Sequence, residues 1–413
     1  MPTIEPLTPQ PYLRAFSGYG IELEYMIVGQ DSLSVSTMAD RLLALQAGEI
    51  VNEVDKGALA WSNELVLHVI ELKTNGPAPS IENLGEAFGE AVRDINIQLS
   101  PMGAMLLPGA MHPLFDPETE TRLWPHGQNE IYAAYDRIFT CRGHGWSNLQ
   151  SMHINLPFFD SEEFRRLHAA IRIALPLIPA LAAASPLVEG AWSGWMDTRL
   201  KFYRDNQRRI PEIAGRIVPE AVESIADYHA RILGPMYRAI EPHDPDGILA
   251  DDWLNSRGAI ARFERQTIEI RIIDIQECPA ADLAIAEAVV ALVCRLYQSD
   301  ELLERGQALS TAALSQQLFA AAERGSAVDF DYAPWLSIFG SGPSRSGRAL
   351  WLDLLDGLDV SNAAAAKLST MVERGTLGEA LRRRLGEQPA RTAIVDCYRE
   401  LAECLDRNRL FQP

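Results

Sequence analysis

The stretch Gly20-Ile21-Glu22-Leu23-Glu24-Tyr25 decides the fold, because it places two acidic side chains two residues apart inside an apolar run. In a β-strand, residues i and i+2 point to the same face. The stretch therefore predicts a strand with an apolar face, which packs into a core, and a second face that carries Glu22 and Glu24.

Three further segments repeat this pattern along the chain. Each is an apolar run with two charged or polar side chains two residues apart, so each also predicts a strand with one polar face. Taken singly, such a pattern is more often the solvated face of an edge strand, a cross-strand ion pair or a buried core histidine. Four such segments in one chain, however, favour a single site to which all of them contribute. The three segments are residues 69–74 with Glu71 and Lys73, 151–156 with His153 and Asn155, and 267–274 with Glu269 and Arg271.

The chemistry of these side chains indicates what such a site binds. Buried charges are costly unless they are paired or bind a cation. Mg²⁺ and Mn²⁺ prefer carboxylate oxygens, and in nucleotide enzymes phosphate oxygens complete their coordination shell. The four segments therefore predict a sheet whose concave face binds divalent cations together with a nucleotide.

The bulk composition excludes several other classes of protein. A formal net charge of -19 over 413 residues argues against nucleic acid or an anionic membrane as a partner. Five cysteines without a CxxC pair predict reduced thiols and a cytoplasmic protein, and residues 1–16 lack the apolar core of a secretory signal. The most apolar stretch, 171–188, contains Arg172 and three prolines, so we expect a buried helix there and no membrane span.

The order of elements predicts an α+β fold with an antiparallel or mixed sheet and helices packed outside it. We expect a hairpin within 49–72 that turns at Asp55-Lys56-Gly57, and a short strand at 105–110. One catalytic domain would span 1–413, with a sheet-bearing core over about 14–300 and a helical portion over about 301–413. Helices are expected at 35–47, 80–99 with Ser80 as N-cap, 129–139, 161–184, 218–239 and 280–303, and over most of the chain beyond, with a break at 339–348.

Motifs of other enzyme classes do not occur in the sequence. There is no G-x-x-x-x-G-K-[ST] phosphate loop, and the glycine-rich run 340–347 follows no predicted strand. HExxH and GxSxG are also missing. His112 stands at the end of a predicted strand, where it either contacts substrate or caps a turn.

In their order and spacing, the polar strands and the segments between them resemble the glutamate–cysteine ligase family 2 of carboxylate–amine ligases, whose sheet is similar to that of glutamine synthetase. The resemblance extends from Gly20 to about Cys294 and more faintly to the C-terminus. The matching segments are residues 20–24, 63–74, 108–113, 151–155, 185–186 and 268–274.

The resemblance implies a cage of strands that binds Mg-ATP. It implies that Arg271 faces the transferred phosphoryl group and acts with Glu269 in catalysis, and that Arg199 lies near the acid substrate. Other substrate contacts would come from Thr74, Asn155 and His112. The implied metal ligands, or their near neighbours, are Glu22, Glu24, Glu64, Glu71, His153 and Glu269.

The expected activity is an ATP-dependent ligase that forms an amide, of the γ-glutamyl type, through an acyl phosphate. Small acid and amine molecules would be its substrates, with glutamate and cysteine as one candidate pair, and a homo-oligomer is compatible with the sequence. Two alternatives stay open: a kinase like the guanidino phosphotransferases, and a non-catalytic metabolite-binding relative. Guanidino phosphotransferases hold the nucleotide mainly with arginines, whereas this chain offers carboxylates.

Overall fold

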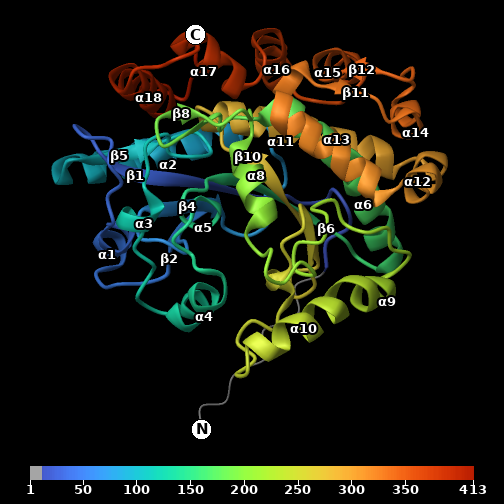
Figure 1. Ribbon diagram of the computed structural model, residues 1–413, viewed down its shortest axis with the longest axis horizontal. Coiled ribbons are helices and arrows are strands. Elements are labelled where there is room, and N and C mark those ends of the chain that lie inside the picture. Colours follow the sequence, from blue (N-terminus) through green and yellow to red (C-terminus); the bar gives the residue numbers. More distant parts are fainter. Residues whose placement is uncertain (1–11) are drawn as a thin grey trace.

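The first predicted strand forms β1 (Gly20–Gly29) at the centre of an eight-stranded sheet in the computed structural model, which describes residues 12–413 (Figure 1). Residues 1–11, which belong to the stretch expected to lack a signal, lie outside the described part. Neighbouring strands pair antiparallel throughout this sheet in the order β2-β3-β4-β1-β6-β10-β9, and β5 pairs with β1, so the predicted α+β class is confirmed. The other strands are β2 (Glu53–Lys56), β3 (Leu59–Asn63), β4 (Val69–Thr74), β5 (Ala104–Leu107), β6 (Ser151–Pro157), β9 (Ala259–Arg262) and β10 (Thr267–Asp274).

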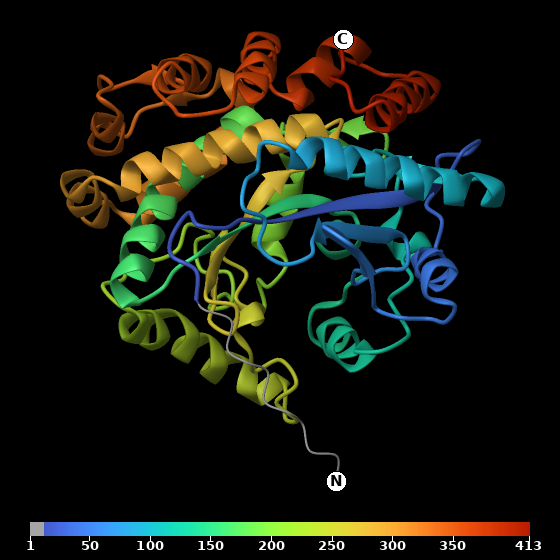
Figure 2. The ribbon, with the colours of Figure 1, turned by 180° about the vertical axis from the view of Figure 1, so that it is seen from behind.

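One face of the sheet is apolar and packs against two long helices. The alternate residues Ile21, Leu23 and Tyr25 of β1 are fully buried on this face. The helices α2 (Leu84–Leu99) and α11 (Pro279–Tyr297) cover it and lie side by side in Figure 2. Burying each such side chain contributes roughly 1.5–3 kcal/mol, so this layer holds the strands in register.

The opposite face of β1 is divided into a polar and an apolar part. Glu22 and Glu24 lie on it, but the next residues on that face, Met26 and Val28, are fully buried in a second hydrophobic cluster. Side chains from α17 (Leu377–Leu385) and α18 (Arg391–Asp406) complete this cluster. The C-terminal helices therefore cover one end of the face and leave the polar end for a site.

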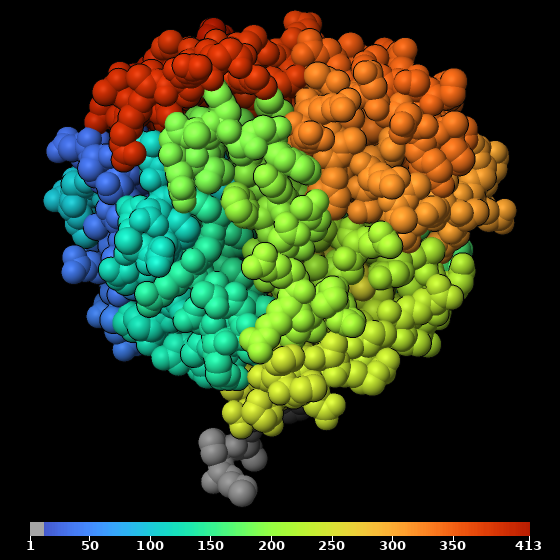
Figure 3. Space-filling view, viewed as in Figure 1, coloured from blue at the N-terminus to red at the C-terminus, as the bar shows by residue number. Residues whose placement is uncertain are grey.

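Short helices from two parts of the chain lie over the polar end. They are α4 (Asn129–Phe139) and α5 (His144–Ser147) from one part, and α8 (Thr198–Asp205) from the other. The segments around α4 and around α8 meet on the face of the molecule seen in Figure 3. The polar face of the sheet is thus enclosed by loops and short helices that are distant in sequence.

Several predicted helices begin or end differently in the structure. The predicted N-cap at Ser80 is wrong, because α2 begins after Asn83, and Ser80 Oγ accepts a bond from the Glu82 amide in the preceding turn. The expected helix 161–184 divides into α6 (Ser161–Ala174), a 3₁₀ turn (Leu175–Leu177) and α7 (Pro179–Ala182). Prolines 176 and 179 lack the amide that a continuous helix needs.

Only the part of the expected helix 218–239 that follows Ser224 is helical. It consists of α9 (Ile225–Tyr228), a π-helical turn (His229–Leu233) and α10 (Gly234–Ile240), because Ser224 caps α9 by accepting a bond from Asp227 N. Likewise 280–303 splits at the cap Ser299 into α11 and α12 (Asp300–Gln307). The remaining elements are α1 (Ala39–Ala47), α3 (Pro117–Glu120), β7 (Leu187–Val188), β8 (Ala191–Trp192), α13 (Thr311–Arg324), β11 (Asp329–Phe330), α14 (Ala333–Leu336), β12 (Arg345–Ser346), α15 (Gly347–Leu355) and α16 (Asn362–Arg374).

The expected break at 339–348 contains β12, which pairs with β11 as a small two-stranded sheet, so the C-terminal portion is not purely helical. Within residues 12–413, none of the helices combines the length and the apolar character that crossing a membrane requires.

A buried histidine in α6 makes the folded protein sensitive to acid. His168 is 1% exposed between Phe164 and Tyr228, and neither ring nitrogen has a hydrogen-bond partner among the described residues. Burial, with a smaller effect of Arg172, lowers the pKa of His168 to about 3. The unfolded chain, with the ordinary value of about 6.5, therefore takes up the proton first as the pH falls.

We expect His168→Phe to remove this acid sensitivity. Because its folded pKa is depressed, His168 costs the wild type about 2 kcal/mol of unfolding free energy between pH 7 and pH 5, and phenylalanine cannot titrate. Urea unfolding at both pH values measures the difference. Burial also lowers the pKa values of His68 and His112 to about 4, but their contribution to the loss of stability is the same in the variant and in the wild type. An equal loss of stability in variant and wild type would contradict the assignment.

Candidate active site

The antiparallel register brings acidic side chains from neighbouring strands together. On β1, Glu22 lies opposite Lys73 of β4 and His153 of β6, and Glu24 lies opposite Glu71 of β4. Ligand atoms of Glu22, Glu71 and His153 lie within 4.8 Å of one another, and so do those of a second group that shares Glu71. We call the union of the two groups the carboxylate cage. Its residues are Glu22, Glu24, Glu64, Glu71 and His153.

The cage holds more negative charge than its surroundings stabilise. Burial and the neighbouring Glu24 and Glu71 raise the pKa of Glu64 well above its usual range. Burial and Glu22 raise the pKa of Glu71 to about 7, although Lys73 Nζ lies 3.2 Å from Glu71 Oε2. Lys73 also pairs with Glu53 on β2, at 2.8 Å. A buried set of carboxylate oxygens with an unmet need for positive charge suits Mg²⁺ or Mn²⁺.

His153 anchors one side of the cage. Although burial opposes its charge, the hydrogen bond to Glu22 and the nearby carboxylates raise the pKa of His153 to about 9. Nδ1 then donates to Glu22 Oε2 at 2.8 Å, and Nε2 donates to Ser151 Oγ at 3.0 Å. Ser151 in turn donates to Glu24 Oε2 from its hydroxyl (2.9 Å) and its amide (2.6 Å). This chain fixes Glu22 and Glu24 before any cation binds, and because both ring nitrogens donate in it, the cage would hold a cation through its carboxylates while His153 acts as their neighbour.

Glu269 lies between two arginines and outside the cage. Its carboxylate is 3.1 Å from Arg262 Nη1 and 3.1 Å from Arg271 Nε, and it belongs to neither group of ligand atoms. The metal role of Glu269 therefore stays a prediction, and its Oε1 is buried without a hydrogen-bond partner among the described residues. Because the side chain is only 2% exposed and ion-paired on both sides, its carboxylate also holds both guanidinium groups in place.

Arg199 lies on α8 with one edge fixed and the other free. Its Nε donates to Asp274 Oδ1 at 2.5 Å, and Asp274 Oδ2 accepts further bonds from Ala184 N and Ser185 Oγ, each 2.8 Å long. Arg199 Nη2 is buried without a partner among the described residues. A guanidinium anchored on one edge is suited to receive a carboxylate on the other.

A cavity of about 500 Å³ is lined by part of the cage and by the arginines. Two strands bring Glu24 and His153 to its wall, Arg199 reaches it from α8, and Arg262 and Arg271 reach it from β9 and β10. Anionic groups of a ligand in this cavity would therefore meet cations on one side and arginines on the other. Apart from aromatic residues, its remaining polar and charged lining comes from Glu64, Gln128, Ser151, Asn206, Gln207, Ser256 and Arg265.

Three residues predicted to bind substrate do not line this cavity. Thr74 accepts a bond from the Ile21 amide at 3.2 Å, and Asn155 donates to Glu22 Oε1 at 3.0 Å, so both support the polar strands. His112 is 2% exposed and lies away from the cage. Its Nδ1 accepts from Leu114 N at 3.1 Å, so Nε2 donates to Leu33 O at 2.6 Å. Of the two roles predicted for His112, these bonds support the cap of a turn and not the contact with substrate.

Several residues of the cavity were not identified in the sequence. Arg262 and Arg265 border the turn between β9 and β10, and Arg265 Nη1 lies 3.9 Å from Glu22 Oε1. Residues 259–274 alternate like a hairpin, which is the signal that could have found them. Tyr132 and Tyr203 come from α4 and α8, and helical spacing alone does not show which cavity a helix borders.

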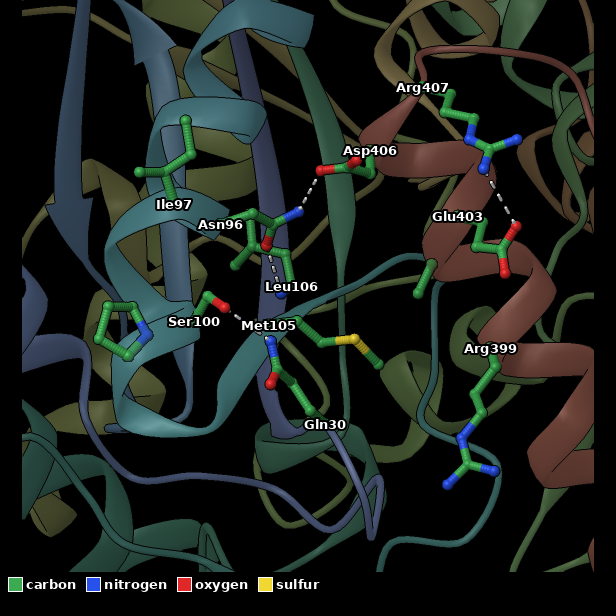
Figure 4. A pocket seen from close by; sticks show the side chains of 12 residues that line it. Gln30, Asn96, Ile97, Ser100, Met105, Leu106, Arg399, Glu403, Asp406 and Arg407 are labelled. Carbon is green, nitrogen blue, oxygen red and sulfur yellow. Dashed lines mark hydrogen bonds and ion pairs between the residues drawn. The ribbon is translucent and has the colours of Figure 1, made fainter.

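A larger cavity of about 680 Å³ opens elsewhere, between α2, β5 and α18 (Figure 4). Its polar side chains bind one another: Asn96 Nδ2 donates to Asp406 Oδ1 at 3.2 Å, and Arg407 lies 3.9 Å from Glu403. It contains neither group of ligand atoms of the cage. The smaller cavity is therefore the candidate active site.

The antiparallel sheet, with the carboxylate cage and the arginines at its polar face, has the fold of the glutamine-synthetase-like ligases. The family model for glutamate–cysteine ligase family 2 matches residues 19–327, and the chain belongs to this family. Membership supports an ATP-dependent carboxylate–amine ligase.

Two relatives and two solved structures show how far the similarity extends. An uncharacterized protein of Archaeoglobus fulgidus is 34% identical over 95% of this chain and 99% of its own length. A putative glutamate–cysteine ligase 2 of Bradyrhizobium diazoefficiens is 24% identical over 87% of this chain and 78% of its own.

Among solved structures, a glutamate–cysteine ligase from Francisella tularensis in complex with AMP superposes with a TM-score of 0.60 at 15% identity, over 96% of this chain and 90% of that one. A bifunctional glutathione synthetase from Pasteurella multocida gives a TM-score of 0.55 at 15% identity, over 94% of this chain and 52% of that one. At these identities the two structures support the fold alone.

Proposed function

We propose that this protein joins a carboxylic acid, with glutamate as the first candidate, to a primary amine at the expense of ATP and through an acyl phosphate. The observation that carries the proposal is one cavity lined both by Glu24, Glu64 and His153 of the carboxylate cage and by the arginines Arg199, Arg262 and Arg271. Family membership supports the class of reaction, and the residues of the cavity support the roles that follow.

The reaction requires a carboxylate to become a good acyl donor. A carboxylate oxygen attacks the γ-phosphorus of ATP, ADP leaves, and the acid becomes an acyl phosphate. The amine nitrogen then attacks the acyl carbon, inorganic phosphate leaves with the bonding electron pair, and the nitrogen loses a proton. Both the acid and the triphosphate are anionic, so the site must offset their repulsion before the first step occurs.

Different residues of the cavity would bind the cation, the phosphoryl group and the acid. The carboxylate cage would hold Mg²⁺ or Mn²⁺, which when bound supplies positive charge to the triphosphate. Arg271 and Arg262, both oriented by Glu269, would donate to the phosphoryl oxygens as charge develops on them. Arg199 would bind the second carboxylate of an amino-acid-like substrate through its free Nη2.

Trapping with hydroxylamine tests this function. We expect the protein, Mg-ATP and the correct acid to yield a hydroxamate, because this small nucleophile intercepts an acyl phosphate. The measurement is the colour of the ferric hydroxamate over a panel of acids that begins with glutamate, with ADP release followed in parallel. Release of ADP should depend on the acid.

Two results would contradict the proposal. A phosphorylated guanidine as product, or ADP release that is independent of any acid, would favour a kinase. Absence of Mg-ATP binding by a folded protein would favour a metabolite-binding relative without catalysis.

A further inference from the structure

Four aromatic rings line one side of the active-site cavity. Tyr132 and Tyr135 come from α4, Trp146 from α5 and Trp253 from the 3₁₀ turn Asp252–Leu254. The ring centroid of Tyr135 lies 5.2 Å from that of Trp146 and 6.0 Å from that of Trp253. All four are only partly buried. We call these four residues the aromatic wall. It offers apolar surface to a ligand.

A face of α8 that continues past its end adds polar groups to the same cavity. Arg199, Tyr203 and Gln207 follow one another at intervals of four residues, so they lie along one side of the helix and the turn after it. Gln207 is 2% exposed, and its Nε2 donates to Ser256 Oγ at 2.8 Å. Gln207 Oε1 and the Tyr203 hydroxyl have no partner among the described residues. A buried acceptor of this kind is satisfied by a hydrogen-bond donor on a ligand.

The position of the wall indicates whether the amine substrate or the adenine ring of ATP contacts it. Tyr132 lies near Glu64 of the cage, and Tyr135 lies near Arg271. Tyr203 is one helical turn from Arg199. The wall therefore adjoins the reacting end of the cavity. The amine nitrogen must reach the acyl carbon at that end, whereas ribose and two phosphates separate adenine from the γ-phosphate. This placement favours the amine over the adenine ring.

We propose that the aromatic wall, with Tyr203 and Gln207, binds the amine substrate, and that this amine carries a bulky apolar or aromatic group and a hydrogen-bond donor. The inference rests on the ligase function proposed above. An amine as small as ethylamine would leave most of the wall in contact with water. A larger amine would cover more of the wall's apolar area, and this difference in buried area is the source of the expected selectivity.

The experiment compares nucleophiles on the wild-type protein with Mg-ATP and the acid that gives a hydroxamate. Phenethylamine and ethylamine are primary amines that differ mainly in the aromatic ring, and tyramine adds a hydroxyl donor. We expect kcat/KM for phenethylamine to exceed that for ethylamine by about 10-fold or more. We expect a further gain for tyramine, which can donate to Gln207 Oε1.

A variant assigns the preference to the wall. Trp253→Ala should lower the ratio of kcat/KM for phenethylamine to that for hydroxylamine by about 10-fold, since hydroxylamine is too small to cover the wall. Phe159→Ala, at an aromatic residue that is 43% exposed and outside the cavity, should leave this ratio unchanged. The wild-type comparison does not depend on the folding of either variant.

The outcomes separate this inference from the function beneath it. Hydroxamate formation with no preference for phenethylamine over ethylamine would overturn the amine assignment and leave the ligase function standing. Competition of phenethylamine with ATP rather than with hydroxylamine would assign the wall to adenine and also overturn it. Failure of every acid to give a hydroxamate, in a folded protein that binds Mg-ATP, would overturn the ligase function and the inference with it.

Discussion

Replacing Glu71 with glutamine is expected to lower kcat by about 10²- to 10³-fold while the protein stays folded. Glu71 belongs to both groups of ligand atoms in the carboxylate cage, so it is the residue that every cation held there would share. Glutamine is nearly isosteric but neutral, and hard divalent cations bind it more weakly than a carboxylate. The loss should therefore appear both in turnover and in the affinity for Mg-ATP.

The measurement is steady-state kinetics with calorimetry of ATP binding, in Mg²⁺ and in excess EDTA. Wild-type protein should show heat of binding only with the cation, because unshielded carboxylates repel the triphosphate. Glu53→Gln is a matched control: Glu53 also contacts Lys73, at 2.8 Å, but it is half exposed on β2 and outside the cage. Equal effects of the two substitutions would mean that Lys73, and not a cation, is the partner that matters.

The strands and most of the cage follow from local sequence. Alternation of apolar and acidic residues is a property of a single strand, so Glu22 and Glu24 could be assigned to one face without a structure. That Glu24 lies opposite Glu71 depends on the β1–β4 register, which the apolar faces fix because a slip of one residue would bury the acids.

Other parts of the site depend on contacts between distant segments. The role of Glu269 follows from Arg262 on the paired strand β9, and a β-bulge after Ile270 changes the course of the strand at Arg271. His112 looked like a site residue because polar residues at strand ends often are, but its partner Leu33 O is 79 residues away. Periodicity within one strand carries no information about such partners.

The helix ends show the same limit. Asn129–Phe139 was predicted with its exact bounds because its apolar stripe and its ends are local. By contrast, the apolar periodicity of residues 161–184 continues past Pro176 and Pro179. The helix ends there because these prolines lack the amide hydrogen that a helix needs, although the apolar side chains beyond them remain buried in the core.

Replacing Arg271 with alanine is expected to lower kcat by at least about 10²-fold, with a smaller effect on the affinity for ATP. Arg271 Nε lies 3.1 Å from Glu269, and its Nη1 donates to Asn255 O at 3.3 Å, so the guanidinium is held in place before substrate binds. A group fixed in this way acts most strongly on charge that develops in the transition state. Arg271→Lys should restore only part of the activity, because a lysine cannot reproduce the planar, two-sided contacts.

Glu269→Gln provides the complementary test, since it leaves both arginines present but weakens the carboxylate that orients them. We expect it to lower kcat as well, whereas Arg231→Ala, at an exposed arginine paired with Asp227 outside the cavity, should change neither kcat nor KM. Single-turnover kinetics of hydroxamate formation and nucleotide titration separate the two effects. If Arg271→Ala weakened ATP binding and left kcat intact, Arg271 would be an anchor for the bound nucleotide, and the phosphoryl-transfer role argued from its contact with Glu269 would be wrong.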